Sequence, residues 1–167
     1  DESPYTMQNS NARLAFGARA AEMLSANYYS VGYSGRGMYR NFAGAAGDPV
    51  PAFYLKTLPE GVSSDWDVTR ATPDVVVINL GTNDFSPAGT SGVGVDHQAY
   101  RCAYVTFLSR LRRYYPKATL VATLGPMMSD DYPAGEDALT NARTIIQEVV
   151  AARRASGDTH VAFFEFD

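Results

Sequence analysis

The sequence predicts an α/β protein built around a parallel sheet. Short apolar runs alternate with longer segments in which apolar residues recur at helical spacing, and several runs end in glycine-containing turns. The 167 residues are 46% hydrophobic and 19% charged, which is typical of one folded domain with a core. Because alternating strands and helices form right-handed crossovers, we expect parallel strands with helices on both faces of the sheet.

The first predicted element is a helix over residues 11–27, with Asn9 or Ser10 as its N-cap. Its apolar face would consist of Leu14, Ala18, Ala21 and Leu24. The run at 28–33 is rich in tyrosine and valine, so it predicts a short strand that leads into a glycine-containing loop.

The middle of the chain begins with a long connection, residues 40–73, in which Pro and Gly breaks leave room for one helical turn near 53–58. Connections of this length are usually functional or poorly ordered. Residues 74–80 contain the run Val-Val-Val-Ile, which is typical of a strand buried on both faces of a parallel sheet. A helix over 97–115 follows, with Asp96 as a good N-cap.

The last third of the chain repeats this pattern. It predicts a strand over 118–124, a helix over 138–154 and a final strand over 159–166. The predicted order is therefore helix, strand, loop, strand, helix, strand, helix, strand. No internal repeat or low-complexity segment interrupts it.

Composition narrows the classes of function. The net charge is −4 and the basic residues are scattered, which argues against binding to nucleic acid or to an anionic membrane. No segment is apolar over the length that a membrane span needs. The single cysteine, Cys102, excludes an intrachain disulfide and, with only two histidines, argues against a zinc site. We therefore expect no metal and no cofactor.

The chemistry is expected in the loops that follow the strands, because α/β sheets bind ligands beyond the carboxyl ends of their strands. Three loops meet this description: residues 34–41, 81–86 and 125–131. The first offers Gly35, whose backbone can approach a ligand closely. The second offers the side-chain amide of Asn83. The alternative for Asn83 is a purely structural role, since Asn commonly satisfies turn backbone.

Other motifs are weaker. The segment from Gly35 begins like a dinucleotide fingerprint, but Arg40 occupies the third glycine position and no Walker lysine follows. Ser34 lies in a near match to the Gly-x-Ser-x-Gly nucleophile elbow, which Arg36 breaks. Ser34 is therefore predicted to be a turn residue. Four further polar residues are predicted to be solvated or structural: His97, Asp130, Asp131 and His160.

Several motifs together resemble a known family. Residues 81–84 (Gly-Thr-Asn-Asp), placed after a buried strand, resemble the third block of the SGNH (GDSL-type) hydrolases. Residues 33–41 resemble the second block in the form found in carbohydrate esterase family 2. Ser64–Asp67, which lead to Pro73–Val77, and Leu124–Met127 also resemble that family. This resemblance implies a flavodoxin-like three-layer α/β/α fold, here without its first strand.

The resemblance also implies an activity and a site. The family consists of serine esterases that remove acetyl groups from plant polysaccharides such as xylan and glucomannan, so the expected partner is an acetylated polysaccharide and the expected location is extracellular. The matching positions would be two oxyanion-hole donors, the Gly35 N–H and the Asn83 amide. Substrate contacts are then expected from Arg40, Asn41, Asp84 and Met127.

The chain departs from the family pattern at both ends. The family's nucleophile follows a first strand in Gly-Asp-Ser, whereas Ser3 does not follow a strand, and the family's histidine base lies in an Asp-x-x-His block beyond the last strand. Residues 1–167 are therefore expected to be the internal part of a longer esterase. Two alternatives stay open: a carbohydrate-binding module without turnover, and an unrelated α/β hydrolase with Ser34 as nucleophile.

Overall fold

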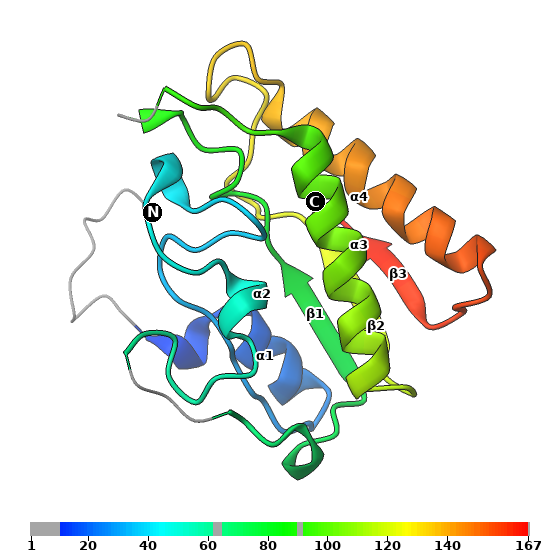
Figure 1. The fold of residues 1–167 in the computed structure, drawn as a ribbon. Coiled ribbons are helices and arrows are strands. Elements are labelled where there is room, and N and C mark those ends of the chain that lie inside the picture. Colours follow the sequence, from blue (N-terminus) through cyan, green and yellow to red (C-terminus); the bar gives the residue numbers. More distant parts are fainter. Residues whose placement is uncertain (1–10, 62–64, 90–91, 167) are drawn as a thin grey trace. The chain divides into compact units, whose positions relative to one another are not determined.

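The computed structural model describes residues 11–61, 65–89 and 92–166, and the chain divides into two compact units (Figure 1). The smaller unit extends to Gly32 and the larger one begins at Tyr33. No helix in the described part of the chain combines the length and the hydrophobicity that a membrane span requires.

The smaller unit contains two short helices where one long helix was predicted. They are a 3-10 helix, Ala12–Leu14, and α1, Phe16–Met23. Ala15 separates them because its backbone is extended (ψ 148°). The apolar face predicted for this segment is not buried within the unit, and Leu14 is 67% exposed. The predicted N-caps, Asn9 and Ser10, lie outside the described residues.

The prediction of a strand at residues 28–33 is wrong. The segment has neither helix nor strand structure, and its residues are exposed. A β-prone sequence becomes a strand only where a neighbouring strand supplies hydrogen-bond partners, since β propensity depends strongly on context. Residues 28–33 have a β-prone composition but no paired neighbouring strand.

The larger unit contains the sheet, and its predicted strands and long helices are confirmed to within a few residues. Its elements in chain order are a 3-10 helix (Phe42–Gly44), α2 (Val50–Phe53), a 3-10 helix (Val68–Arg70), β1 (Val75–Asn79), α3 (His97–Tyr114), β2 (Thr119–Thr123), α4 (Ala138–Ala155) and β3 (Val161–Phe164). The helical turn expected near 53–58 begins earlier, because Pro51 favours the first turn of a helix. The Asp96 carboxylate caps α3 by accepting the N–H groups of Gln98 and Ala99.

The three strands are parallel and lie in the order β1-β2-β3. When consecutive parallel strands are added in one direction, right-handed crossovers place their helices on the same face. α3 and α4 therefore pack against each other and against one face of the sheet (Figure 1). In the larger unit this replaces the expected helices on both faces.

The two faces of the sheet differ in burial. Val76, Leu120 and Val161 are in register across the strands and belong to the helix-covered core. Val75 and Val77 point to the other face and are 50% and 51% exposed. The expectation that this strand is buried on both faces is therefore not met in the structure.

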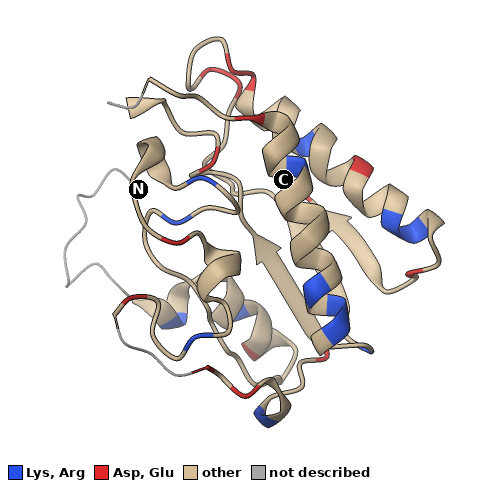
Figure 2. Cartoon of the chain, viewed as in Figure 1, with Lys and Arg blue, Asp and Glu red and all other residues tan. Residues whose placement is uncertain are grey.

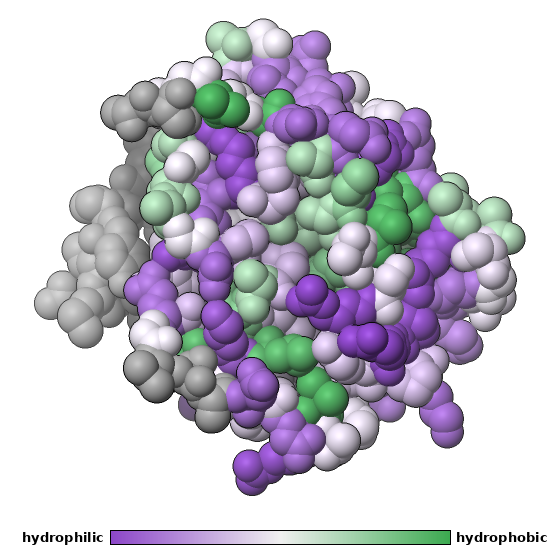
Figure 3. Space-filling model, viewed as in Figure 1, coloured by the Kyte–Doolittle hydropathy of each residue, from purple (hydrophilic) through white to green (hydrophobic). Residues whose placement is uncertain are grey.

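The helix surfaces show ordinary patterning. Figure 2 shows Lys and Arg gathered at the C-terminal ends of α3 and α4, where the last turns carry two arginines each. Positive charge there complements the helix dipole. On the face drawn in Figure 3, hydrophobic side chains gather over the N-terminal half of α3.

Candidate active site

The candidate site is formed by loops at the C-terminal edge of the sheet. β1 leads directly into residues 81–87, and β2 leads into 125–131. The carboxyl ends of neighbouring parallel strands meet at one edge, so these two loops are neighbours. Hydrogen bonds join the loop at 34–41 to the loop at 81–87.

Asp84 is the central acceptor between these two loops. Its side chain is fully buried, and its carboxylate accepts the N–H groups of Met38 (2.8 Å), Tyr39 (2.8 Å) and Arg40 (2.9 Å). Burial raises the pKa of this carboxyl above its ordinary value, and the three backbone hydrogen bonds reduce the rise without cancelling it.

Arg40 makes the reverse connection. Arg40 is only 8% exposed. Its guanidinium donates to the carbonyl oxygens of Asp84, Ser86 and Pro87, each at 2.9 Å. The planar fork of arginine suits several carbonyls at once. Each charged side chain therefore binds the backbone of the opposite loop.

The side chain of Asn83 also binds the loop at 34–41. Its Nδ2 donates to the carbonyl oxygen of Arg36 at 2.8 Å, one residue from Gly35. A side-chain amide carries two N–H hydrogens, so this bond leaves a second hydrogen for another acceptor. Gly35 has a positive φ of 76°, and its carbonyl accepts the N–H of Phe42 (2.8 Å). The Asn83 amide is thus held at the residue that follows Gly35 in the chain.

The close approach of the loops depends on glycine. A Cβ on Gly37 would lie 2.1 Å from the Arg40 carbonyl oxygen and 2.5 Å from a carboxylate oxygen of Asp84. A Cβ on Gly125 would lie 2.3 Å from the hydroxyl of Thr82. A real Cβ essentially never approaches a non-bonded heavy atom this closely, so at both places only the bare glycine backbone fits.

The four predicted substrate contacts separate into two kinds. Arg40, Asn41 and Asp84 are buried, and Asn41 donates its amide to the carbonyls of Ala45 (3.1 Å) and Gly47 (2.8 Å). Their polar atoms bind loop backbone. Only Met127, which is 88% exposed, is free to meet a ligand.

The structure adds residues that sequence reasoning missed. His97 pairs through Nε2 with Glu136 at 2.8 Å, and its ring stacks on Phe85 with centroids 5.5 Å apart. Ser86 donates to the carbonyl of Asn83 (2.6 Å) and accepts the N–H of Ala43 (2.8 Å). The His97–Glu136 and Ala43–Ser86 pairs are 39 and 43 residues apart in sequence, and no local motif marks them.

No serine–histidine pair of a hydrolase is found in the part of the chain that the structure describes. His97 is bonded to Glu136, Ser34 is exposed, and the hydrogen bonds recorded for His160 involve only its backbone. Within the same residues, no cluster of His, Cys, Asp and Glu could hold a metal ion.

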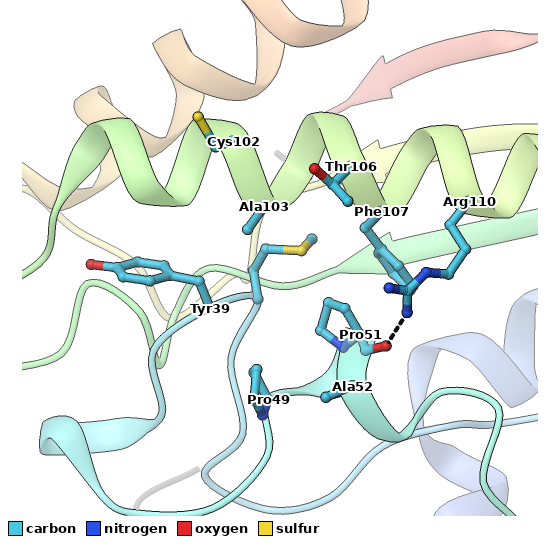
Figure 4. Close-up of a pocket in the computed structure, with 10 residues that line it drawn as sticks. Tyr39, Pro49, Pro51, Ala52, Cys102, Ala103, Thr106, Phe107 and Arg110 are labelled. Atoms are coloured by element: carbon cyan, nitrogen blue, oxygen red, sulfur yellow. Dashed lines mark hydrogen bonds between the residues drawn. The ribbon is translucent and has the colours of Figure 1, made fainter.

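A groove of about 380 Å³ lies between α2 and α3 (Figure 4). Tyr39 lies at one end, Cys102 belongs to α3, and Arg110 donates to the carbonyl of Pro51 at 2.5 Å. None of the described residues that line it is a serine, a histidine or a carboxylate. The groove is therefore not where the candidate chemistry is assembled.

Known proteins resemble most of the chain. A model of the GDSL-like Lipase/Acylhydrolase family matches residues 6–167. The cellulase/esterase CelE of Acetivibrio thermocellus is 37% identical over 166 residues, which cover 99% of this chain and 19% of that protein. An acetylxylan esterase / glucomannan deacetylase of Cellvibrio japonicus is 36% identical over 126 residues, covering 74% of this chain and 34% of the relative.

Solved structures agree. A family two carbohydrate esterase from Clostridium thermocellum, in complex with cellohexaose, has a TM-score of 0.82 and 36% identity over 96% of this chain. A Corynascus carbohydrate esterase family 2 enzyme with a carbohydrate binding domain has a TM-score of 0.77 and 33% identity over 89% of it. The chain spans 46% and 45% of those two chains, and less of the two curated relatives.

Proposed function

Because the chain belongs to the GDSL-like Lipase/Acylhydrolase family, we propose that it is part of a serine esterase that removes acetyl groups from plant polysaccharides. Asn83 and Gly35 supply two donors of the oxyanion hole in this proposal. The observation that carries it is the 2.8 Å bond from the Asn83 amide to the carbonyl of Arg36, the residue that follows Gly35.

The geometry suits acyl transfer. Attack on an ester builds negative charge on the carbonyl oxygen, and preorganised N–H donors at that oxygen lower the barrier by about 3–4 kcal/mol each in favourable cases. Asn83 lies in the loop that follows β1, and its amide is already held by one bond. The donor thus needs little reorganisation when charge develops.

The nucleophile and the general base are proposed to come from sequence that flanks residues 1–167 in a longer enzyme. Support comes from the lengths compared: the chain covers 46% of the Clostridium thermocellum esterase. A second candidate, hydrolysis by Ser34 within this chain, has less support because Ser34 is exposed and neither histidine is bonded to it among the described residues.

The substrate is proposed to be an acetylated xylan or glucomannan outside the cell, because a relative is named an acetylxylan esterase / glucomannan deacetylase and a solved relative holds cellohexaose. A carbohydrate-binding module without turnover is the remaining alternative. Exposed Met127, in the loop at 125–131, is the proposed contact to the sugar.

The test is Asn83→Ala in the longer enzyme, with an acetylated xylooligosaccharide as substrate. We expect kcat to fall by about 10²–10³-fold, the usual cost of one oxyanion donor. KM should change little, because the donor acts mainly in the transition state. Thermal unfolding measured on the same preparation separates loss of catalysis from loss of fold.

The matched control is Asn141→Ala. The Asn141 amide donates to the carbonyl of Glu136 at 2.7 Å, so it makes the same kind of bond at a different loop. We expect its kcat to stay near wild type. Normal kcat in well-folded Asn83→Ala would refute the oxyanion assignment, and turnover by the 167-residue chain alone that Ser34→Ala abolishes would favour the second candidate.

A further inference from the structure

Two buried charged residues join the loops that carry the proposed oxyanion donors. We propose that Asp84 and Arg40 are positioning residues, which fix the Gly35 N–H and the Asn83 amide relative to each other without touching substrate. The inference rests on the proposed function, since positioning matters for turnover only if these two groups act on the substrate.

The connection runs in both directions. The Asp84 carboxylate, from the loop at 81–87, accepts three successive N–H groups of the loop at 34–41. The Arg40 guanidinium, from the loop at 34–41, donates to three carbonyls of the loop at 81–87. The two loops are therefore joined both through backbone N–H groups and through backbone carbonyls, by two different side chains. This leaves either loop little freedom to move relative to the other.

Burial makes this arrangement stiff. The Asp84 side chain has no exposed surface, and Arg40 is only 8% exposed. Water cannot replace a hydrogen bond that breaks there, so any alternative loop geometry leaves a buried charge unpaired. The same burial keeps both charged groups away from a polysaccharide.

Gly37 supplies an independent observation. The space that its Cβ would occupy is filled by the Arg40 carbonyl oxygen at 2.1 Å and an Asp84 carboxylate oxygen at 2.5 Å. The backbone of the first loop therefore presses directly against the carboxylate. The contact with the carboxylate joins the first loop to Asp84, the residue after Asn83.

The experiment is a double-mutant cycle in the longer enzyme. Asp84→Asn keeps the shape of the side chain but replaces one carboxylate oxygen with an N–H donor. We expect kcat to fall by about 10- to 100-fold, with KM changed less than about twofold. In Asn83→Ala/Asp84→Asn, the loss of kcat should be smaller than the product of the two single losses, because part of the effect of Asp84 is exerted through the Asn83 amide.

Asp158→Asn is the matched control. Asp158 is also a mostly buried aspartate with arginine partners, but it lies at the opposite edge of the sheet. We expect it to lower stability and leave kcat unchanged. If Asp84→Asn does not fold, Arg40→Lys takes its place in the cycle with the same expected results, since it keeps the charge and loses the fork.

The outcomes separate the two proposals. If Asn83→Ala lowers kcat and folded Asp84→Asn does not, or if their effects multiply, positioning is refuted and the esterase site stands. If Asn83→Ala leaves kcat unchanged, the proposed oxyanion hole is refuted, and the positioning inference that rests on it is refuted as well.

Amide hydrogen exchange on the longer enzyme tests the geometry without catalysis. The N–H groups of residues 38–40 should exchange at least about 100-fold more slowly than that of exposed Gly94. Equal rates would overturn the inference.

Discussion

The two ends of the sheet use the same residue types in different ways. At the C-terminal edge, Asp84 and Arg40 each bind the backbone of the opposite loop. At the N-terminal edge, Arg112 binds Asp158 directly through Nε (2.9 Å) and Nη2 (3.0 Å), and Arg153 binds the same carboxylate at 2.7 Å.

The cluster at the N-terminal edge, Arg112, Arg153 and Asp158, also ties the ends of the chain's strands together. Arg112 donates to the carbonyls of Ala118 (2.6 Å) and His160 (2.9 Å), which directly precede β2 and β3. Arginine binds backbone carbonyls at both edges. The comparison teaches that a direct Arg–Asp pair accompanies these bonds where regular strands begin, whereas Asp84 and Arg40 each bind the opposite loop and so define the shape of irregular segments.

The largest effect is expected for Arg112→Ala. It removes every bond that Arg112 makes to the two strand ends and leaves Asp158 with Arg153 as its remaining arginine partner, so we expect unfolding free energy to fall by about 2–4 kcal/mol. Urea unfolding gives this value, and kinetics of the longer enzyme should show an unchanged kcat. A tenfold loss of kcat in the folded variant would break the contrast between the edges.

A smaller effect is expected for Gly37→Ala at the C-terminal edge. The added methyl must displace the Arg40 carbonyl or the Asp84 carboxylate, and overpacking of this kind costs about 1–3 kcal/mol. Since the displaced atoms hold the proposed donors, kcat should fall about tenfold. Gly94→Ala is the control, because nothing lies within 4 Å of its Cβ position, and it should match wild type in both measurements.

The pH dependence of stability sharpens the comparison further. Burial opposes ionisation of Asp158, but hydrogen bonds from Arg112 and Arg153 outweigh it and hold the pKa below its ordinary value of 3.8. A lowered pKa in the folded state contributes stability that is present above 3.8 and is lost as pH falls through the folded value.

Asp158→Asn should therefore be less stable than wild type by about 1–2 kcal/mol at neutral pH. This difference should shrink as pH falls below 3.8, and thermal unfolding at a series of pH values measures it. For Asp84 the sign is opposite, because its folded pKa is raised, so its contribution to stability decreases as pH rises through the window above 3.8.

The smallest effect is expected for Met127→Ala. The side chain is 88% exposed, so the unfolding free energy should change by less than about 0.5 kcal/mol. If Met127 contacts the sugar as proposed, KM for the acetylated oligosaccharide should rise about threefold while kcat stays constant. An unchanged KM would remove the one exposed residue from the proposed substrate contacts.

Much of the fold was readable from the sequence because it is encoded locally. The continuous apolar run Val-Val-Val-Ile predicts a strand, and the helical spacing of apolar residues predicts the two long helices. This strand and these helices are confirmed. The rule that ligand loops follow the carboxyl ends of parallel strands places the loops at 81–87 and 125–131 at one edge, but the loop at 34–41 joins them through hydrogen bonds and not through a preceding strand.

Tertiary structure decided what depends on partners distant in the chain. The run at 28–33 has strand propensity but forms no strand, because a strand exists only with a neighbour. Asp84 and Arg40 were expected to meet substrate, yet their partners lie 44 to 47 residues away on the opposite loop. Sequence spacing shows which residues can donate or accept hydrogen bonds. Whether they face solvent or another loop depends on burial, which only the folded chain defines.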